Sequence, residues 1–218
     1  MEKTIIQVVH ATKTFKETTA LDDISISFDQ NQIHGIIGRN GSGKTVLLKC
    51  ICGLTRLNKG TITVRDKVVG VDMDIPPHVG AIIEAPGFLP NYSGLQNLKF
   101  LAGINRTIQL NDIKDSLKIV GLDPNMKKHV GKYSLGMRQR LGIAQAIMEK
   151  PDILILDEPM NGLDNEGVLE IRKLLLQLKS SGVTILLASH SKVDIQILCD
   201  TVIEMDNGKI ISTQPYKV

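Results

Sequence analysis

The chain has 218 residues and a formal net charge of +3, and 42% of its residues are hydrophobic and 22% charged. These values are typical of one globular domain and exclude disordered and fibrous chains, while the apolar runs are far shorter than the roughly 18 residues of a membrane-spanning helix. The basic residues form no long run, so nucleic acid is not expected as a partner. No signal peptide is visible, and we expect a cytoplasmic protein whose three cysteines are reduced core residues.

The first thirty residues predict an antiparallel β subdomain. Residues 4–9 and 22–28 have the composition of strands, and a turn rather than a helix joins them. Residues 32–37 form a third strand-like stretch, and an amphipathic helix follows it from Gly43. This strand and helix begin a second pattern, in which short apolar strands alternate with helices.

Residues 86–150 predict an inserted α-helical subdomain, because strand signals vanish there and apolar residues recur at helical spacing. The two periodic series are Leu95, Leu98 and Leu101, and Ile113, Leu117 and Val120. After this insert the alternation resumes, and the chain closes in a hairpin with Asn207-Gly208 at its turn. The expected elements are strands at 152–156 and 183–188, helices at 166–180 and from Ser191, and hairpin strands at 201–205 and 209–212.

Alternating strands and helices predict the α/β class, with a parallel sheet covered by helices. We expect residues 1–85 and 151–218 to form one core, which includes the antiparallel β flap, and the helical insert to extend from it. The chain shows no internal repeat or Pro-rich linker, so a single domain is expected.

Residues 38–45 have the pattern of a loop that binds nucleoside triphosphates. In this pattern glycine backbones approach the phosphates, a lysine reaches the β and γ phosphates, and a hydroxyl holds Mg²⁺. The loop follows a strand and opens an amphipathic helix, whose N-terminal dipole faces the anion. Its residues are Gly38, Arg39, Asn40, Gly41, Ser42, Gly43, Lys44 and Thr45. The alternative is a glycine-rich turn with a surface lysine.

Two acids, Asp157 and Glu158, follow the apolar stretch 153–156. In an open α/β sheet, ligands bind at the carboxyl ends of the strands. An aspartate there is suited to hold Mg²⁺, and a neighbouring glutamate to orient or deprotonate an attacking water. Without the phosphate loop, the two residues would be interpreted as solvated acids at a strand end.

With these two motifs the sequence resembles the ATP-binding-cassette ATPases, the motor subunits of ABC transporters. The likeness covers nearly the whole chain, and the family's motifs occur in the family's order. The resemblance implies a P-loop NTPase fold with a RecA-like parallel sheet core, and ATP and Mg²⁺ as cofactors. The motifs are residues 38–45, 79–98, 133–137, 153–159, 161–164 and 188–190.

In the family, residues 133–137 correspond to the signature motif, which contacts the γ phosphate bound to a second copy of the domain. The resemblance assigns the direct phosphate contacts to Ser134 and Gly136, and it includes Met137 among the nucleotide-binding residues. The sequence departs from the motif at two positions, because the family usually has glycine in place of Leu135 and glutamine in place of Met137. Taken alone, Ser134 would be interpreted as an ordinary helix cap.

Three further residues match family positions. His190 corresponds to the switch histidine, which contacts the γ phosphate and the water-positioning glutamate, and Asp164 to the aspartate that crosses the dimer interface. Phe15 is similar to the aromatic residue that stacks on adenine. The alternatives are a core or capping role for His190 and core packing for Phe15. We expect His190 to be catalytic together with Lys44 and Glu158.

Glu84 departs from the family, which mostly has a glutamine there that reaches Mg²⁺ and the attacking water. A carboxylate is able to bind the metal, so Glu84 is expected to join Thr45 and Asp157 as a ligand, although its charge opposes that of the phosphates. Residues 82–91 and the signature motif resemble the subgroup of bacterial exporters involved in bacitracin resistance and lantibiotic self-protection.

The resemblance implies that two copies, or this chain and a homologous subunit, bind ATP in a head-to-tail sandwich that hydrolysis reopens. A separate multi-spanning permease is the expected second partner; it would dock on the helical insert, hold the chain at the inner face of the membrane and export a peptide antibiotic, bacteriocin or drug. The alternatives are a soluble cassette ATPase that acts on ribosomes, DNA or a cofactor-assembly complex, and a regulatory nucleotide binder without turnover.

Overall fold

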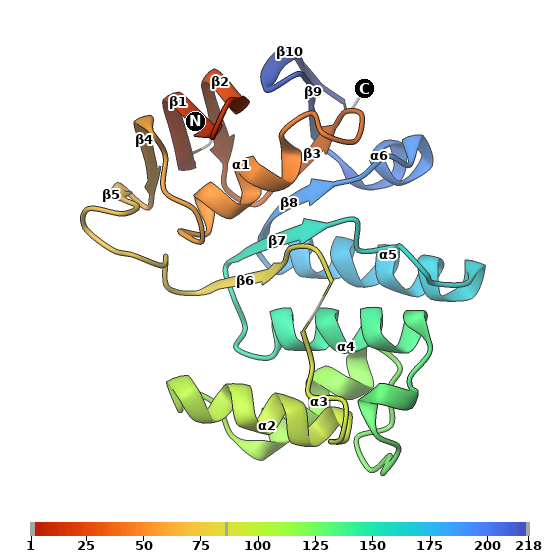
Figure 1. Cartoon of the computed structure of the whole chain (residues 1–218). Helices are drawn as coiled ribbons and strands as arrows, with labels where there is room; N and C mark the ends of the chain where they lie inside the picture. The colour runs from red at the N-terminus through yellow and green to blue at the C-terminus, as the bar shows by residue number, and fades with distance from the viewer. Residues whose placement is uncertain (1–2, 86, 217–218) are drawn as a thin grey trace.

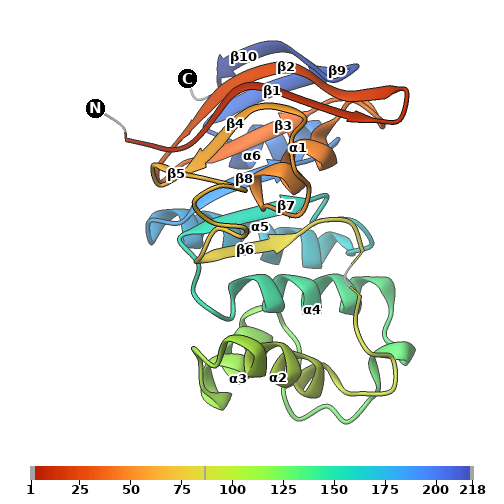
Figure 2. The same ribbon diagram turned by 60° about the vertical axis from the view of Figure 1, so that its left-hand side comes forward.

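The computed structural model describes residues 3–85 and 87–216 and arranges them in three tiers (Figure 1). An antiparallel sheet forms the first tier, a mostly parallel sheet with its helices the second, and a group of helices from the middle of the chain the third. Turning the molecule separates the same three tiers (Figure 2), so this order is not an effect of one viewing direction. The expected α/β class, β subdomain and helical insert are all present.

The antiparallel sheet has the strand order β2-β1-β4-β5. Its first two strands pair as the sequence predicted, but both are longer than the stretches 4–9 and 22–28. The reason is that shifts in the register of β1 against β2 break the regular alternation of apolar and polar residues along them. The strands are β1 Thr4–Phe15, β2 Thr18–Asp29, β4 Lys59–Val64 and β5 Lys67–Val68, of which the last two were not predicted.

The second sheet has the order β10-β9-β3-β8-β7-β6, and its strands from β9 to β6 run parallel. Only β10 is antiparallel to its neighbour, and the predicted turn of that hairpin is confirmed, since Asn207 and Gly208 both have positive φ, 47° and 77°. The strands are β3 Ile33–Ile37, β6 Val79–Ile82, β7 Ile153–Asp157, β8 Thr184–Ala188, β9 Thr201–Asp206 and β10 Lys209–Pro215.

Helices connect the parallel strands and build the third tier. Helix α1 follows β3, α5 lies between β7 and β8, and α6 between β8 and β9, while α2, α3 and α4 form the third tier (Figure 1). Throughout the described part of the chain, each helix is too short or too polar to cross a bilayer. The helices are α1 Lys44–Ile51, α2 Gly94–Asn105, α3 Leu110–Ile119, η1 Val130–Lys132, α4 Leu135–Ile147, α5 Asn165–Ser180 and α6 Lys192–Leu198.

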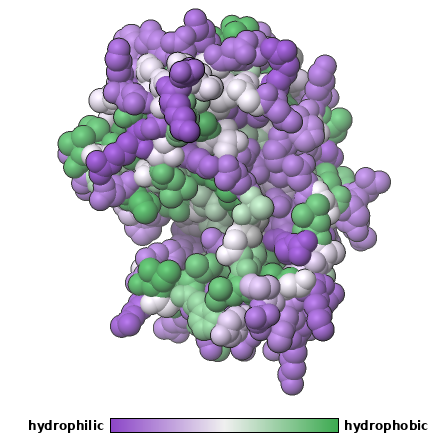
Figure 3. Space-filling view, in the orientation of Figure 1, coloured by the Kyte–Doolittle hydropathy of each residue, from purple (hydrophilic) through white to green (hydrophobic). Residues whose placement is uncertain are grey.

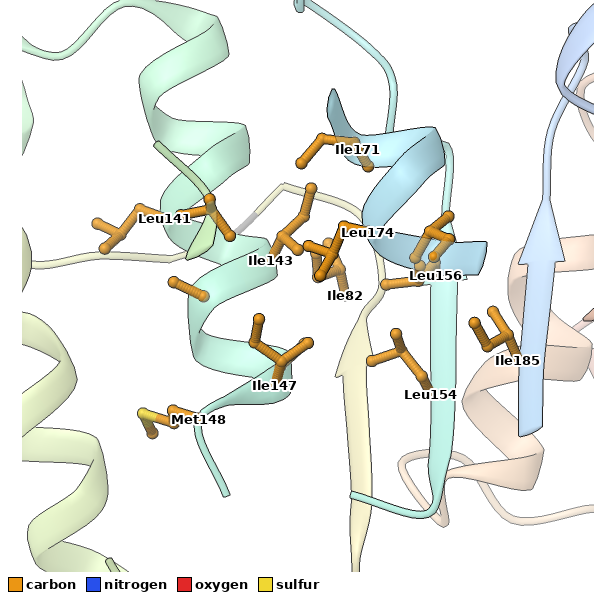
Figure 4. Packing of buried hydrophobic residues seen from close by; sticks show 14 of the residues in the cluster. Ile82, Leu141, Ile143, Ile147, Met148, Leu154, Leu156, Ile171, Leu174 and Ile185 are labelled. Carbon is orange, nitrogen blue, oxygen red and sulfur yellow. The ribbon is translucent and has the colours of Figure 1, made fainter. Parts of the chain in front are cut away.

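A single apolar cluster joins the third tier to the parallel sheet. Figure 4 shows Ile143 and Ile147 of α4 facing Ile82 of β6, Leu154 of β7 and Leu174 of α5. The same cluster extends to buried residues of α2 and α3. Because close-packed interiors resist small displacements, this cluster fixes α4 relative to β7, and the candidate site lies at the carboxyl end of β7.

Candidate nucleotide site

The loop from Gly38 to Thr45 turns sharply between β3 and α1. Gly43 caps α1 with φ 104°, and a Cβ atom there would lie 2.5 Å from the carbonyl oxygen of Ala20, so the position requires glycine. The buried side chain of Lys44 folds back over the loop, and its Nζ donates hydrogen bonds to the carbonyl oxygens of Gly38 and Arg39 at 2.7 and 3.1 Å. The loop therefore joins a strand to the first turn of a helix, as its sequence predicted.

Strand β2 and the turn between β9 and β10 lie beside this loop and are linked to it by hydrogen bonds. The amide of Gly208, in the β9–β10 turn, donates to the carbonyl oxygen of Ser42 at 3.0 Å, and the amide of Asp22 donates to the carbonyl oxygen of Gly208 at 2.8 Å. Arg39 pairs with Asp206 at 2.8 Å, and the hydrogen bond and charge of that carboxylate raise the pKa of the guanidinium. Strand β2 and the C-terminal hairpin thus hold the phosphate loop between them.

Thr45 and Asp157 meet beside the loop. The Thr45 Oγ1 atom donates a hydrogen bond to Oδ2 of Asp157 at 2.7 Å, which joins the first turn of α1 to the end of β7. A hydroxyl oxygen and a carboxylate oxygen are both hard ligands of the kind that Mg²⁺ prefers. The two predicted ligands are therefore adjacent, although the strands that position them are far apart in the sequence.

Glu158, the residue after β7, contacts the residue that follows β8 by two positions. Its Oε2 lies 2.8 Å from Nδ1 of His190, and its amide donates to the carbonyl oxygen of Ala188 at 2.9 Å. Glu158 has φ 51°, a left-handed conformation that costs free energy in a residue other than glycine and occurs often at functional sites. The side chain of His190 is 67% exposed, so the alternative of a core histidine is wrong.

A cavity of about 780 Å³ lies in front of these groups. The side chains of Lys44, Thr45, Asp157 and Glu158 line it, and Asn40, Gly41, Ser42 and Gly43 form its phosphate-loop wall. His190 does not line this cavity but a neighbouring one of about 770 Å³, whose wall includes Gly38 and Arg39. Consecutive residues of the loop line the two cavities, and the contact between Glu158 and His190 joins a residue of one wall to a residue of the other.

Two polar groups of the loop fit a bound phosphate. Ser42 Oγ is buried and has no hydrogen-bond partner within residues 3–85 and 87–216, and an orphaned buried hydroxyl is costly unless a ligand satisfies it. The buried Lys44 bonds to loop carbonyl oxygens rather than to a carboxylate. The loop therefore has a donor and a cation available for an anion.

The predicted signature residues lie at the start of α4. Ser134 caps the helix, because its Oγ accepts a hydrogen bond from the amide of Met137 at 3.1 Å. Ser134 is exposed, whereas Gly136 and Met137 are partly buried and Met137 packs against the apolar cluster. Asp164 is also exposed and caps α5 through the amide of Gly167 at 2.9 Å. A capping role accounts for both hydroxyl and carboxylate without a ligand.

Phe15 ends strand β1, and its side chain is not part of the core. The residue is 48% exposed, so the alternative of core packing is wrong. Lys13 places its Nζ 4.8 Å from the centre of the ring, a cation–π contact. An exposed aromatic ring suits base stacking, which stays a prediction.

Glu84 lines the cavity of about 780 Å³, and its carboxylate contacts the ammonium group of Lys49. Its Oε1 forms an ion pair with Nζ of Lys49 at 2.7 Å, while Thr45 and Asp157 bond to each other. All four residues line the same cavity. The structure thus brings the three predicted metal ligands into one cavity, and two of them into contact.

Comparison with known proteins assigns the chain to a family. The family model described as "ABC transporter" matches residues 21–161, which include the phosphate loop, the signature residues and both strand-end acids. The chain belongs to the ABC transporter family, as an ATP-binding cassette. It is thus an ABC-type ATPase subunit, as its sequence indicated.

Several bacterial relatives align with nearly all of this cassette. It is 46% identical to an uncharacterized ABC transporter ATP-binding protein, YybJ of Bacillus subtilis, over 96% of both chains. It is 39% identical to the bacitracin transport ATP-binding protein BcrA of Bacillus licheniformis, over 98% of this chain and 70% of BcrA. It is 32% identical to the lantibiotic transport ATP-binding protein SrtF of Streptococcus pyogenes, over 97% of this chain and 91% of SrtF.

Solved cassettes have the same fold. The dimeric cassette MJ0796, in a post-hydrolysis state bound to ADP and Pi, superposes with a TM-score of 0.89 at 20% identity, over 98% of this chain and all (100%) of that one. The cassette cbiO1 of Clostridium perfringens, part of the transporter complex cbiONQ, superposes with a TM-score of 0.84 at 28% identity. The match covers 99% of this chain and 90% of cbiO1. The predicted cassette fold is therefore confirmed.

Sequence reasoning missed two polar residues of the cassette's large cavity. Lys49 follows Thr45 by four residues on α1, a spacing that places both on one face of a helix and was a usable signal. Gln139 of α4 is buried, and its Nε2 donates to the carbonyl oxygen of Glu158 at 3.4 Å. Gln139 connects the signature helix to Glu158 through a contact that spacing alone does not reveal.

Proposed function

We propose that the cassette hydrolyses ATP to drive export of a peptide antibiotic, bacteriocin or drug by a separate membrane subunit. The observation that carries the proposal is the contact of Glu158 with His190 beside the bonded pair of Thr45 and Asp157. The class of substrate rests on similarity to BcrA and SrtF, whose names refer to bacitracin and lantibiotic transport.

Each side chain has a distinct part in the proposed reaction. Lys44 releases the loop carbonyl oxygens and, with the loop amides, binds the phosphates. Glu158 orients the attacking water, and His190 holds the Glu158 carboxylate and stabilises charge that develops on the γ phosphate. Thr45 and Asp157 would hold Mg²⁺, which supplies neutralisation of charge on the β and γ oxygens.

We propose further that two copies of the cassette face each other, each completing the other's site. Ser134 and Asp164 are exposed, as residues that reach a second copy must be. Helix α4 has thirteen residues and begins at Leu135, so its positive end follows Ser134 directly. The dimeric solved cassette MJ0796 offers a precedent for such an assembly in the same fold.

The membrane subunit is proposed to dock over the recess between the second and third tiers, which would hold the cassette at the inner face of the membrane. Figure 3 shows apolar surface on both sides of this recess. Solvent-exposed apolar patches often mark protein interfaces. The exposed large apolar residues of the chain segments on either side of β6 include Leu54, Val71 and Ile75 before this strand, and Leu89, Tyr92, Phe100 and Ile104 after it.

The proposal is tested by two variants of the catalytic groups. Glu158→Gln keeps the shape of the side chain but removes the carboxylate, so it should bind ATP, lose nearly all phosphate release and accumulate as a dimer in sedimentation. Lys44→Ala should lose both turnover and tight binding. Steady phosphate release that survives Lys44→Ala would contradict the assignment of this site. Only monomer with saturating ATP in Glu158→Gln would contradict the sandwich.

A separate experiment tests the membrane partner. Capture of the tagged cassette from detergent-solubilised membranes should bring down a multi-spanning protein. A triple variant of the third tier, Tyr92→Ser, Phe100→Ser and Ile104→Ser, should reduce this capture without changing turnover, because these side chains are exposed and lie outside the cavity. Capture of ribosomes or a soluble complex in place of a membrane protein would favour the alternative of a soluble cassette ATPase.

A further inference from the structure

Glu84 lies at the point where the chain leaves the parallel sheet for the third tier. Strand β6 ends at Ile82, and helix α2 begins at Gly94. Glu84 has φ 63°, which is unfavourable for a residue with a side chain. A conformation of this kind persists only where surrounding contacts hold it. The described contact of its side chain is the ion pair with Lys49.

Lys49 comes to this contact from another element of the cavity wall. It belongs to α1, and its Nζ lies 2.7 Å from Oε1 of Glu84. The side chain of Lys49 is 29% exposed and that of Glu84 63%. The pair therefore connects the helix of the phosphate loop to the segment that leads into the third tier.

The charges around the cavity give this pair a second role. Asp157 and Glu158 already line the wall, and Glu84 adds a third carboxylate where a triphosphate would bind. Lys44 is bonded to the carbonyl oxygens of the loop. Lys49 is the cation that contacts Glu84, so it offsets the charge that makes a carboxylate unfavourable at this position.

We infer that Lys49 is the positioning residue for Glu84. It holds the carboxylate against α1 and offsets its charge, so that nucleotide and Glu84 occupy one cavity without repulsion. The inference rests on the proposed function, since the cavity is taken to bind ATP. It has one sharp consequence: Lys49 matters only while residue 84 carries a negative charge.

A double-mutant cycle tests this consequence. Lys49→Met removes the charge and keeps most of the apolar stem, Glu84→Gln removes the partner charge, and the third variant combines them. Lys49→Met alone should lower kcat/KM for ATP about fivefold, the upper range for a partly exposed pair. In the Glu84→Gln background the same change should have less than about a twofold effect. Lys49→Arg should restore most of the loss.

The matched control is Lys118→Met. Lys118 also lies on a helix and pairs with an acid, Asp115, at 3.0 Å, but neither residue lines the cavity. This variant should leave kcat/KM unchanged. An equal loss for Lys49→Met with Glu84 and with Gln at position 84 would overturn the inference, because Lys49 would then act on the nucleotide or on the fold.

A second readout does not depend on turnover. The chain has no tryptophan, so Phe88→Trp places a single tryptophan four residues after Glu84. In the protein without nucleotide, Lys49→Met and Glu84→Gln should shift its emission by the same amount, and the double variant should shift it no further. Additive shifts would contradict the pair. Absence of ATP hydrolysis would refute the proposed function while this measurement still decides whether Lys49 positions Glu84.

Discussion

The Nδ1 atom of His190 lies 2.8 Å from Oε2 of Glu158. The contact links the residues that follow two adjacent parallel strands, β7 and β8, in the register Asp157 to Ala188. Sheet pairing therefore sets this distance, and no long loop has to fold to create it. Because His190 is exposed while Glu158 is partly buried, the imidazole is positioned to hold the carboxylate and still reach a ligand.

His190→Ala should reduce kcat by about a hundredfold or more, since loss of one group that stabilises developing charge costs about 10²- to 10³-fold. The Kd for ATP should change by less than about twofold, because Lys44 and the loop remain. Single-turnover phosphate release and equilibrium ATP binding give the two numbers. His129→Ala, an exposed histidine outside both cavities, is the control. An unchanged kcat would remove His190 from the reaction.

Phe15→Ala should weaken ATP binding by roughly 5- to 150-fold, the range for loss of about 1–3 kcal/mol of base stacking. Its half-exposed ring contributes little to the core, so the melting temperature should stay nearly constant. Calorimetric titration with ATP and with inorganic triphosphate separates the base from the phosphates. Phe15→Tyr should bind both as the unmodified protein does. Equal weakening for ATP and triphosphate would argue against stacking.

The buried ion pair of Arg172 and Asp194, which joins α5 to α6, should be a main determinant of stability near His190. Arg172 donates from Nε and from a terminal nitrogen to Oδ1 of Asp194 at 2.8 and 2.5 Å, and the two side chains are only 16% and 4% exposed. Arg172→Met leaves a buried carboxylate unpaired and should cost about 3–5 kcal/mol. Denaturant unfolding measures this cost.

The double variant Arg172→Met with Asp194→Leu provides the contrast. It removes both charges, so it should recover much of the stability that Arg172→Met alone loses. Lys118→Met, which breaks an exposed pair, should change stability by less than about 1 kcal/mol. A double variant as unstable as the single one would mean that shape and hydrogen bonding, rather than an unpaired charge, dominate here.

Cys50 and Cys52 should be unreactive in the folded cassette at pH 8. Burial raises the pKa of Cys50 to about 11 and that of Cys52 to about 12, whereas the pKa of a thiol in an unfolded chain is about 8.5. A thiol reagent should therefore modify them slowly in the native protein and rapidly in denaturant. Rapid native modification of both would contradict their placement.

The same shifts make stability depend on pH. The unfolded chain loses these thiol protons first, so the free energy of unfolding should fall as the pH rises above about 8.5 toward the folded pKa values. Cys50→Ala with Cys52→Ala should show a smaller decrease between pH 8 and pH 10. The comparison isolates the thiols from the lysines and tyrosines that titrate in the same interval.

The sequence predicted the site where the signal was local. The phosphate loop is recognised by its glycines, and the acids after β7 by the apolar run before them. Both are short patterns that can be found without knowing the fold. Strand β6 was missed because it has four residues, including Gly80 and Ala81, which form strands poorly. The pair of Lys49 and Glu84 joins residues 35 positions apart and depends on where β6 lies in the sheet, which no local pattern specifies.

The strand order of the parallel sheet has a consequence during synthesis. Strands β3 and β6 come from the first half of the chain, but β8 and β7 separate them in the sheet. A nascent chain that ends at residue 150 thus has β3 and the edge strand β6 without the two strands that separate them, and α4 lacks much of the surface on which it packs. We expect such a chain to remain open and to need chaperones until residue 188 leaves the ribosome. Because the bond from Thr45 to Asp157 requires β7 to be in place, retention on an ATP matrix should mark the chain length at which the site is complete.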